Sequence, residues 1–283
     1  MPIRTDLAIE SREMFAEEIA GVETATHDSD GITITHVNIK TKEGAERIGK
    51  PIGSYVTIEI DDMTDGIDTE GRGSGAISSE LKKLLSDKDT SSVLVVGLGN
   101  QYITPDAIGP KTVSKIEVTR HITREAQLGF DFEIKPVSAV APGVLGITGI
   151  ETGEIVKGVV EHVKPSLVIA IDALAARKIK RLGRTVQLSD TGISPGSGVG
   201  NNRKELSEKT LGVPVIAIGI PMVVDAVTLA IDILEDYVKD DSKVREALSG
   251  NGDNMIVTPN DVDAICEQAT DIIADGINMA LHS

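Results

Sequence analysis

From Ser92 onward, short apolar runs alternate with helix-like segments along the chain. Runs such as Val93-Leu94-Val95-Val96 and Leu167-Val168-Ile169-Ala170-Ile171 are typical of strands that are buried on both faces. Such alternation implies strand–helix–strand units with right-handed crossovers, so it predicts a central sheet covered by helices. The sequence therefore predicts the α/β class, as a three-layer α/β/α arrangement with a mostly parallel central sheet.

The alternation predicts strands in this part of the chain at 93–98, 134–140, 167–171, 185–188 and 213–219. It predicts the intervening helices at 109–120, 152–163, 173–181, 203–210 and 221–237. A final helix over about 259–281 is expected to begin with Thr258 as its N-cap and Pro259 in its first turn.

The N-terminal part follows a different pattern, in which apolar and polar residues alternate. This period of two predicts half-exposed strands at 31–39 and 54–60, with a short helix at 44–48 between them. We therefore expect an N-terminal β-hairpin added to the main sheet, after a polar segment with weak helical character over residues 5–19. No repeat or linker divides the chain, so residues 1–283 are expected to form a single domain.

The charge of the chain disfavours a nucleic-acid or membrane partner. Asp and Glu number 44 against 28 Lys and Arg, which gives a formal net charge of −16. Phosphate backbones and anionic membrane surfaces both attract clusters of Lys and Arg, so an acidic chain fits neither role. The sequence has no run of about 18 apolar residues and no apolar signal core at its N-terminus. We therefore expect a cytoplasmic protein.

Cysteine and histidine give no support for a cofactor or a zinc site. Cys266 is the only cysteine, which excludes an internal disulfide and a cysteine cluster for zinc. The five histidines form no HExxH or HxH pair. We expect no cofactor and no metal. One alternative stays open, because the carboxylates of Asp106, Asp172 and Asp190 are oxygen ligands that suit a hard cation such as Mg²⁺.

Two aspartates follow the apolar runs at 93–96 and 167–171. The first run leads through the turn 97–100 to Asp106, and the second leads directly into Asp172. Ligands of open α/β sheets bind outside the carboxyl ends of parallel strands, so neighbouring strands would bring both carboxylates to one cleft. Two carboxylates in one cleft can share a proton and carry out acid–base chemistry. Each aspartate taken alone is equally well explained as part of the first turn of a following helix.

The turn Gly97-Leu98-Gly99-Asn100 is a weak signal for nucleotide binding. Tyr102 stands where a GxGxxG motif has its third glycine, and Thr104-Pro105 precede any helix. A tight turn that delivers Asp106 is the better interpretation. A non-catalytic nucleotide-binding module remains the more distant alternative.

The stretch Gly192-Ile193-Ser194-Pro195-Gly196 matches the residue pattern of a GxSxG nucleophile elbow but not its chemistry. The residue after the serine must donate its backbone N–H to an oxyanion, and Pro195 has no N–H to donate. A Gly/Ser loop over 192–200 is the better interpretation, and its backbone amides can bind an extended peptide or an oxyanion. The candidate residues of a substrate cleft in and before this loop are Asp190, Ser194, Gly196, Ser197 and Gly198.

Long motifs spread over the chain resemble the germination proteases of spore-forming bacteria. These motifs are VVGLGNQYITPDAIGP, APGVLGITGIETGEI, VIAIDALAARKIKR, LSDTGISPGSGVGNNRKE and VPVIAIGIPMVVDA, with RTDLAIE near the N-terminus and NMIVTPNDVDAI near the C-terminus. The resemblance covers nearly the whole chain. It implies an atypical aspartic peptidase with a phosphorylase/hydrolase-like fold, as in the hydrogenase-maturation endopeptidases, and it implies that Asp106 and Asp172 are the essential carboxylates.

The same resemblance implies a substrate and a mode of activation. Members of the family degrade the small acid-soluble proteins that coat DNA in dormant spores, and they are made as inactive tetrameric zymogens that remove their own N-terminal segment. By motif, self-cleavage is expected between Asp6 and Leu7, with a later cut between Glu13 and Met14. Residues 1–6 would then be a propeptide, and the protein would be a homotetramer in the cytoplasm of the spore core.

These observations lead to one mechanistic hypothesis. An ionised aspartate takes a proton from a water that attacks the scissile carbonyl, while its protonated partner stabilises the oxyanion and later protonates the leaving amine. A metal-dependent peptidase or amidohydrolase that uses the same aspartates is the nearest alternative, and sensitivity to chelators separates the two.

Overall fold

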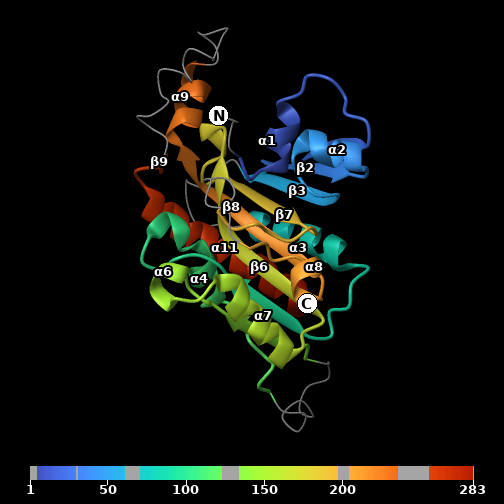
Figure 1. Cartoon of the computed structure of the whole chain (residues 1–283), viewed down its shortest axis with the longest axis vertical. Coiled ribbons are helices and arrows are strands. Elements are labelled where there is room, and N and C mark those ends of the chain that lie inside the picture. Colours follow the sequence, from blue (N-terminus) through green and yellow to red (C-terminus); the bar gives the residue numbers. More distant parts are fainter. Residues whose placement is uncertain are drawn as a thin grey trace.

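One continuous β-sheet runs through the protein, with helices packed along it (Figure 1). The computed structural model describes residues 5–29, 31–60, 71–122, 134–196, 204–234 and 255–282. The strands in these residues are β1 (Val22–Ser29), β2 (Ile32–Ile39), β3 (Gly53–Ile60), β4 (Val93–Gly97), β5 (Val137–Val140), β6 (Leu167–Ala176), β7 (Thr185–Ser189), β8 (Val215–Asp225) and β9 (Ile256–Val257). The helices are α1 (Ala8–Glu13), α2 (Lys42–Ile48), α3 (Arg72–Leu85), α4 (Ile108–Val113), α6 (Leu145–Thr148), α7 (Thr152–Val163), α8 (Glu208–Leu211), α9 (Ala226–Leu234) and α11 (Val262–His282), with 3-10 turns η1 (Thr104–Asp106) and η2 (Ile179–Arg181).

The strands lie in the order β1-β2-β3-β7-β8-β6-β4-β5, and β9 pairs with β8. Strands β8, β6, β4 and β5 are parallel to one another. Strand β7 runs antiparallel to both β8 and β3, and β1, β2 and β3 form an antiparallel extension. The predicted α/β class is confirmed. The sheet is mixed, with a larger antiparallel share than the sequence pattern indicated.

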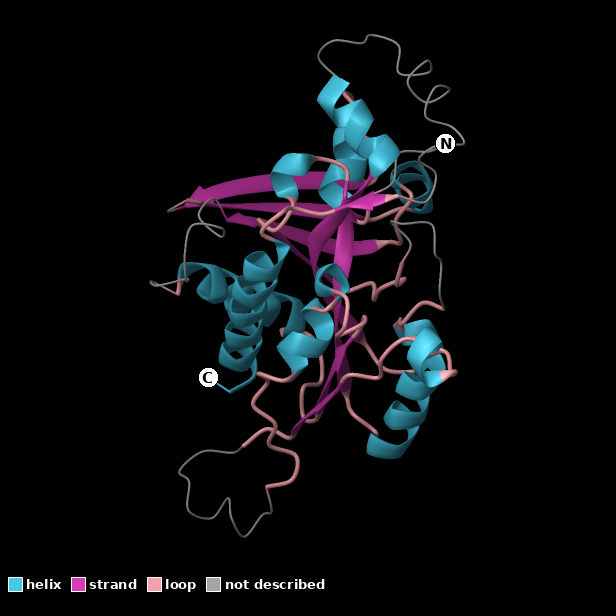
Figure 2. Ribbon diagram, turned by 90° about the vertical axis from the view of Figure 1, so that its left-hand side faces the viewer, coloured by secondary structure: helices cyan, strands magenta, loops and turns pink. Residues whose placement is uncertain are grey.

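Two apolar layers explain why helices cover both faces of the sheet. On one face, Val95 and Ile169 belong to a core cluster that includes residues of α3, α4 and α11. On the other face, Val96 and Val168 pack with residues of α7 and α8. Successive residues of β4 and β6 therefore point to opposite faces, and both faces exclude water. Figure 2 shows the helices on either side of the parallel part of the sheet.

Two helix predictions are wrong because the ladder between β6 and β8 extends beyond the apolar runs. Residues 173–181 are predicted as a helix, but β6 continues to Ala176 in register with β8. The helix predicted at 221–237 begins at Ala226, because residues 221–225 complete β8. Alanine-rich sequence favours a helix in isolation, but pairing with a neighbouring strand overrides that weak preference. Asp172 consequently lies within a strand and not at the end of one.

The N-terminal part contains the predicted hairpin and one strand more. Strands β2 and β3 pair as expected, with α2 between them. Strand β1 at the edge of the sheet is exposed along nearly its whole length, so its sequence lacks the alternation that signals a half-buried strand. The weak helix predicted over residues 5–19 is limited to α1.

Helix boundaries differ from prediction at three further places. The helix predicted at 109–120 is limited to α4, and the one predicted at 203–210 appears, within the described residues, as α8. The last helix begins at Val262, and the Thr258 hydroxyl donates a hydrogen bond to the Met222 carbonyl. The prediction that Thr258 is the N-cap of this helix is therefore wrong.

Two glycines allow α4 to approach β4 closely. A Cβ added at Gly109 would lie 2.2 Å from the carbonyl oxygen of Leu98, and one added at Gly97 would lie 2.1 Å from the carbonyl oxygen of Gly109. No side chain fits at such distances, so only glycine permits this backbone contact. The contact fixes the connection between β4 and α4, which contains Asp106.

We expect Gly109→Ala to destabilise the protein, because the added methyl group would push α4 away from β4. Overpacking of this kind costs about 1–3 kcal/mol, which lowers the midpoint of thermal unfolding by several degrees. Gly158→Ala is the matched control, because it lies in α7 and an added Cβ would meet no atom within 4 Å. The control is expected to be neutral or to gain up to about 1 kcal/mol. Equal midpoints for the two variants would contradict the close contact.

Candidate active site

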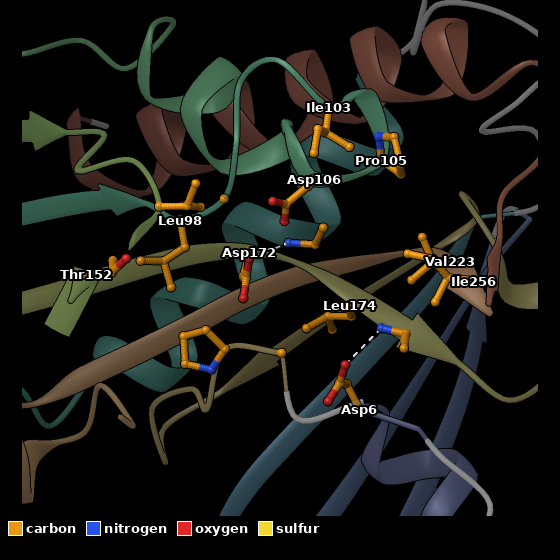
Figure 3. Close-up of a pocket in the computed structure, with 16 residues that line it drawn as sticks. Asp6, Leu98, Ile103, Pro105, Asp106, Thr152, Asp172, Leu174, Val223 and Ile256 are labelled. Carbon is orange, nitrogen blue, oxygen red and sulfur yellow. Dashed lines mark hydrogen bonds between the residues drawn. The ribbon is translucent and has the colours of Figure 1, made fainter. Parts of the chain in front are cut away.

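A cavity of about 230 Å³ lies between the end of β4 and the second half of β6. Asp106 and Asp172 both line it, and so does Asp6 from the N-terminal segment (Figure 3). Its remaining walls are largely apolar, and include Leu98, Ile103, Leu174, Val223 and Ile256. Carboxylates in apolar surroundings interact more strongly with one another and with bound groups than they would in water.

The turn after β4 holds Asp106 through main-chain contacts. The N–H of Asn100 donates to both the carbonyl oxygen and the Oδ2 atom of Asp106, each at 2.9 Å. Gly99 has a φ of 109°, and a Cβ added there would lie 2.1 Å from the carbonyl oxygen of Asp106. The glycine-rich turn therefore delivers Asp106, as the sequence predicts, because a larger residue at position 99 would displace it.

Asp172 lies on β6, beside β4. The two strands are parallel neighbours with Gly97 opposite Ile171, so the condition for one shared cleft is met. Asp172 is buried, with 5 % of its surface exposed, and its Oδ1 atom accepts the N–H of Ala173 at 3.0 Å. Burial and rigid strand pairing hold this carboxylate in place.

The loop after β7 contributes less to the cavity than predicted. Gly196 lines it, together with Pro195, but Asp190 and Ser194 are not among its lining residues. The Oδ1 atom of Asp190 instead accepts the N–H of Ser54 at 2.8 Å, which ties the end of β7 to β3. The candidates Ser197 and Gly198 lie outside the described residues.

Asp6 binds the edge of β6 inside the cavity. Its N–H donates to the carbonyl oxygen of Ala175 at 2.9 Å, and its Oδ2 atom accepts the N–H of Ala175, also at 2.9 Å (Figure 3). The following residue, Leu7, has an extended backbone and is fully buried. The resemblance singles out Asp6 and Leu7 only as a cleavage site, and the position of Asp6 in the same cavity as Asp106 and Asp172 is a finding of the structure.

Two further polar residues hold the peptide unit between Asp6 and Leu7. The carbonyl oxygen of Asp6 accepts hydrogen bonds from Lys50 Nζ at 3.0 Å and from Gln187 Nε2 at 3.2 Å. Gln187 Oε1 also accepts the N–H of Ala8 at 2.6 Å. Gln187 had a signal in the sequence, since it is a polar residue within a predicted buried strand. Lys50 had none, because it follows Gly49 in a polar loop.

Helix α1 is fixed to the turn after β6 by buried charges. Glu10 is fully buried and accepts the N–H groups of Arg177 at 2.6 Å and Lys178 at 2.9 Å. Arg181 is 2 % exposed and donates to Glu13 at 2.6 and 2.7 Å and to Glu59 at 2.9 Å. Buried charges are tolerated only when they are paired and hydrogen-bonded in this way. The cluster keeps the start of α1 against the end of β6.

The described part of the chain contains no group of three or more His, Cys, Asp or Glu side chains placed to hold a metal ion. It also contains no helix that is both long and apolar enough to cross a bilayer.

Comparisons with known proteins identify the family. A family model described as germination protease matches residues 4–243. The chain belongs to the germination protease family. The germination protease of Caldanaerobacter subterraneus subsp. tengcongensis is 48 % identical over 99 % of this chain and 94 % of its own length, and that of Bacillus subtilis is 41 % identical over 99 % and 93 %. As a member of this family, the chain is a protease of spore germination.

One solved structure with a similar chain path is a hydrogenase maturation protease. It is the [NiFe] hydrogenase maturation protease HycI from Thermococcus kodakarensis. The alignment has a TM-score of 0.41 at 17 % identity, and covers 72 % of this chain and 99 % of that one.

We expect Glu10→Ala to lower the free energy of unfolding by about 2–5 kcal/mol, because it would leave the N–H groups of Arg177 and Lys178 without their acceptor and would remove one of the three carboxylates around the Arg181 cation. Denaturant unfolding measures the change. Glu18→Ala, at an exposed position five residues beyond α1, is the control and is expected to change stability by less than about 0.5 kcal/mol. Equal stability of the two variants would show that the buried cluster does not hold α1.

Proposed function

We propose that the chain is an endopeptidase of the atypical aspartic type in which Asp106 and Asp172 activate water. The observation that carries this proposal is that one cavity contains both carboxylates and a peptide segment of the same chain, hydrogen-bonded to β6. Among the described residues that line the cavity there is no Ser, Cys or His. The Thr152 hydroxyl, also in the lining, donates to the carbonyl oxygen of Gly143 at 3.0 Å. The two aspartates are thus the best candidates for the chemistry.

The pair would work as acid and base. One carboxylate is ionised and takes a proton from the attacking water, while the other is protonated and gives its proton to the leaving amine. Two carboxylates in one site favour such unequal protonation, because two like charges close together repel. The apolar walls of the cavity strengthen this repulsion, since they lower the local dielectric constant.

The substrates proposed for this site are the small acid-soluble proteins of dormant spores, whose degradation the enzyme would start during germination. Membership of the germination protease family supports this, as does a cavity that binds an extended peptide. Action in the spore core and assembly as a homotetramer are parts of the same proposal.

We further propose that the N-terminal segment is a propeptide that is cut between Asp6 and Leu7, with a later cut between Glu13 and Met14. Asp6 lines the same cavity as the proposed catalytic pair, so the intact segment would exclude a substrate. Leu7 packs with Leu174, Ala176 and Val224, so a chain that starts at Leu7 would remain anchored.

Asp106→Asn and Asp172→Asn are each expected to lower the cleavage of a small acid-soluble spore protein by at least about 1,000-fold, because neither amide can exchange the proton. Intact-mass spectrometry of the substrate, with and without EDTA, measures the effect. Asp87→Asn, at an exposed position, is the control and should retain full activity. Full activity in either active-site variant would end the proposal, and loss of wild-type activity with EDTA would favour a metal-dependent peptidase.

Deletion of residues 2–6 is expected to give activity without a lag, because the contacts of Asp6 in the cavity are removed while Leu7 and α1 remain. A time course of spore-protein cleavage, compared with the full chain, measures the lag. Circular dichroism and thermal unfolding control for folding. A truncated protein that folds normally but is inert would count against the propeptide role.

A further inference from the structure

The carbonyl oxygen of Asp6 is bound by two donors that come from distant parts of the chain. Lys50 follows the end of α2, and Gln187 lies in the middle of β7. An ammonium group and an amide N–H thus converge on one oxygen, at 3.0 and 3.2 Å. A carbonyl oxygen has two lone pairs, so this one has both satisfied. Such a pair of donors resembles an oxyanion-binding arrangement.

The register of the sheet places Gln187 and Asp172 on the same face. Gln187 is opposite Gly219 of β8, and Gly219 is opposite Asp172 of β6. Residues in one such row point to one side of a sheet. Leu188 and Ile171, one position away in β7 and β6, both belong to the core cluster on the other face, which agrees with this assignment. The donor to the Asp6 carbonyl and one of the two aspartates are therefore in one row across the sheet.

Lys50 brings charge to this oxygen. It is half-buried, and Lys50 Nζ lies 3.4 Å from the carbonyl oxygen of Thr5 as well as contacting that of Asp6. Burial lowers the pKa of the Lys50 ammonium, while the carboxylates of Asp6 and Glu10 act in the opposite direction. A partly desolvated cation stabilises a nearby anion more strongly than an exposed one does.

We propose that Lys50 and Gln187 bind the oxyanion that forms at residue 6 when the Asp6–Leu7 bond is hydrolysed. This inference rests on the proposed self-cleavage at that bond. In substrates, the same two donors bind the carbonyl oxygen of the residue before the scissile bond. Both are catalytic residues, since they touch the reacting group.

The step is a simple hydrolysis. The oxygen of water bonds to the carbonyl carbon of Asp6, one water proton passes to the ionised aspartate, and the π electrons of the carbonyl move to its oxygen, between Lys50 and Gln187. The carbonyl then re-forms as the C–N bond breaks, and the nitrogen of Leu7 takes a proton from the protonated aspartate. The products are a free amine at Leu7 and a new carboxylic acid at Asp6, which then loses its proton to solvent.

A purely structural role is the competing explanation, in which Lys50 and Gln187 only anchor the N-terminal segment. The two explanations differ in what they predict for the rate of self-cleavage and for the dependence of that rate on pH. Loss of an anchor would free the segment and leave the pH profile of cleavage unchanged. Loss of an oxyanion donor lowers the rate by about 100- to 1,000-fold in comparable sites.

The test follows self-cleavage of the full chain by intact-mass spectrometry, as the appearance of a product that starts at Leu7. Lys50→Met is expected to slow it by about 100- to 1,000-fold. Lys50→Arg keeps a cation with N–H donors and is expected to recover part of the rate. Lys40→Met, which removes an exposed lysine paired with Glu23, is the control and should match the wild type. Thermal unfolding of each variant checks that it is folded.

The pH profile provides a readout that an anchor would not change. The wild-type rate should fall as pH rises through the lowered pKa of Lys50, because the ammonium loses its charge. In Lys50→Arg this alkaline fall should move to higher pH, since arginine stays protonated. Gln187→Glu keeps the acceptor for the N–H of Ala8 but removes the amide donor, and is expected to be slow as well.

The same experiment includes the Asp172→Asn variant. It also measures the cleavage of a small acid-soluble spore protein. If Lys50→Met cleaves itself at the wild-type rate while Asp172→Asn does not, the oxyanion role is overturned and the proposed function stands. If the wild type cuts the spore protein but leaves the Asp6–Leu7 bond intact, the inference is again overturned. If the wild type cuts neither, the proposed function fails with it.

Discussion

The free edge of β6 beyond the end of β4 is the feature on which the site depends. Strand β4 ends at Gly97, opposite Ile171, whereas β6 continues to Ala176 with β8 on its other side. Buried backbone groups on such an edge need partners. The N–H of Leu98 satisfies the carbonyl of Ile171, and Asp6 satisfies both backbone groups of Ala175. The same unequal strand lengths that open the cavity thus create a binding edge for an extended peptide.

The ladder between β6 and β8 also explains what the sequence could and could not predict. Apolar runs in β4 and β6 predicted two buried parallel strands with Asp106 and Asp172 after them, and the structure places those strands side by side. The extension of β6 could not be predicted, because Ala173–Ala176 prefer a helix locally and become a strand only through pairing with β8. Strand β1 escaped prediction for a related reason, since it is a polar edge strand held by cross-strand hydrogen bonds.

The polar contacts around Asp6 are a second feature that the sequence pattern could not predict. Lys50, Ala175 and Gln187 are each far from Asp6 along the chain, and only the fold brings them to it. The pairing of Glu10 with the N–H groups of Arg177 and Lys178 is equally invisible, because a glutamate near the N-terminus normally faces solvent. Long-range polar contacts of this kind have no periodicity in the sequence, so the spacing of residues cannot predict them.

The two anchors of the N-terminal segment differ in strength. Leu7 and the residues after it are held by buried apolar contacts and by the cluster of Glu10 and Arg181, whereas the contacts of Thr5 and Asp6 are hydrogen bonds, to Glu10 and at the cavity. A cut after Asp6 would therefore divide the segment where strong anchoring begins. The part beyond the cut would stay on the sheet, and the part before it would keep only contacts that a competing peptide can replace.

The groups proposed for the chemistry come from two kinds of element. Asp172 and Gln187 lie on paired strands, where the register fixes them in one row. Asp106 and Lys50 lie on turns: Asp106 packs against Gly99, seven positions before it, which has a φ of 109°, and Lys50 directly follows Gly49, which has a φ of 73°. Catalytic groups must be held within fractions of an ångström, which loops achieve only when their backbone is constrained. The close packing of Gly99 against Asp106, and the left-handed Gly49 that ends α2 just before Lys50, provide that constraint. Gly99 is accordingly a requirement of the site geometry as well as of its turn, because an added side chain would meet the backbone of Asp106.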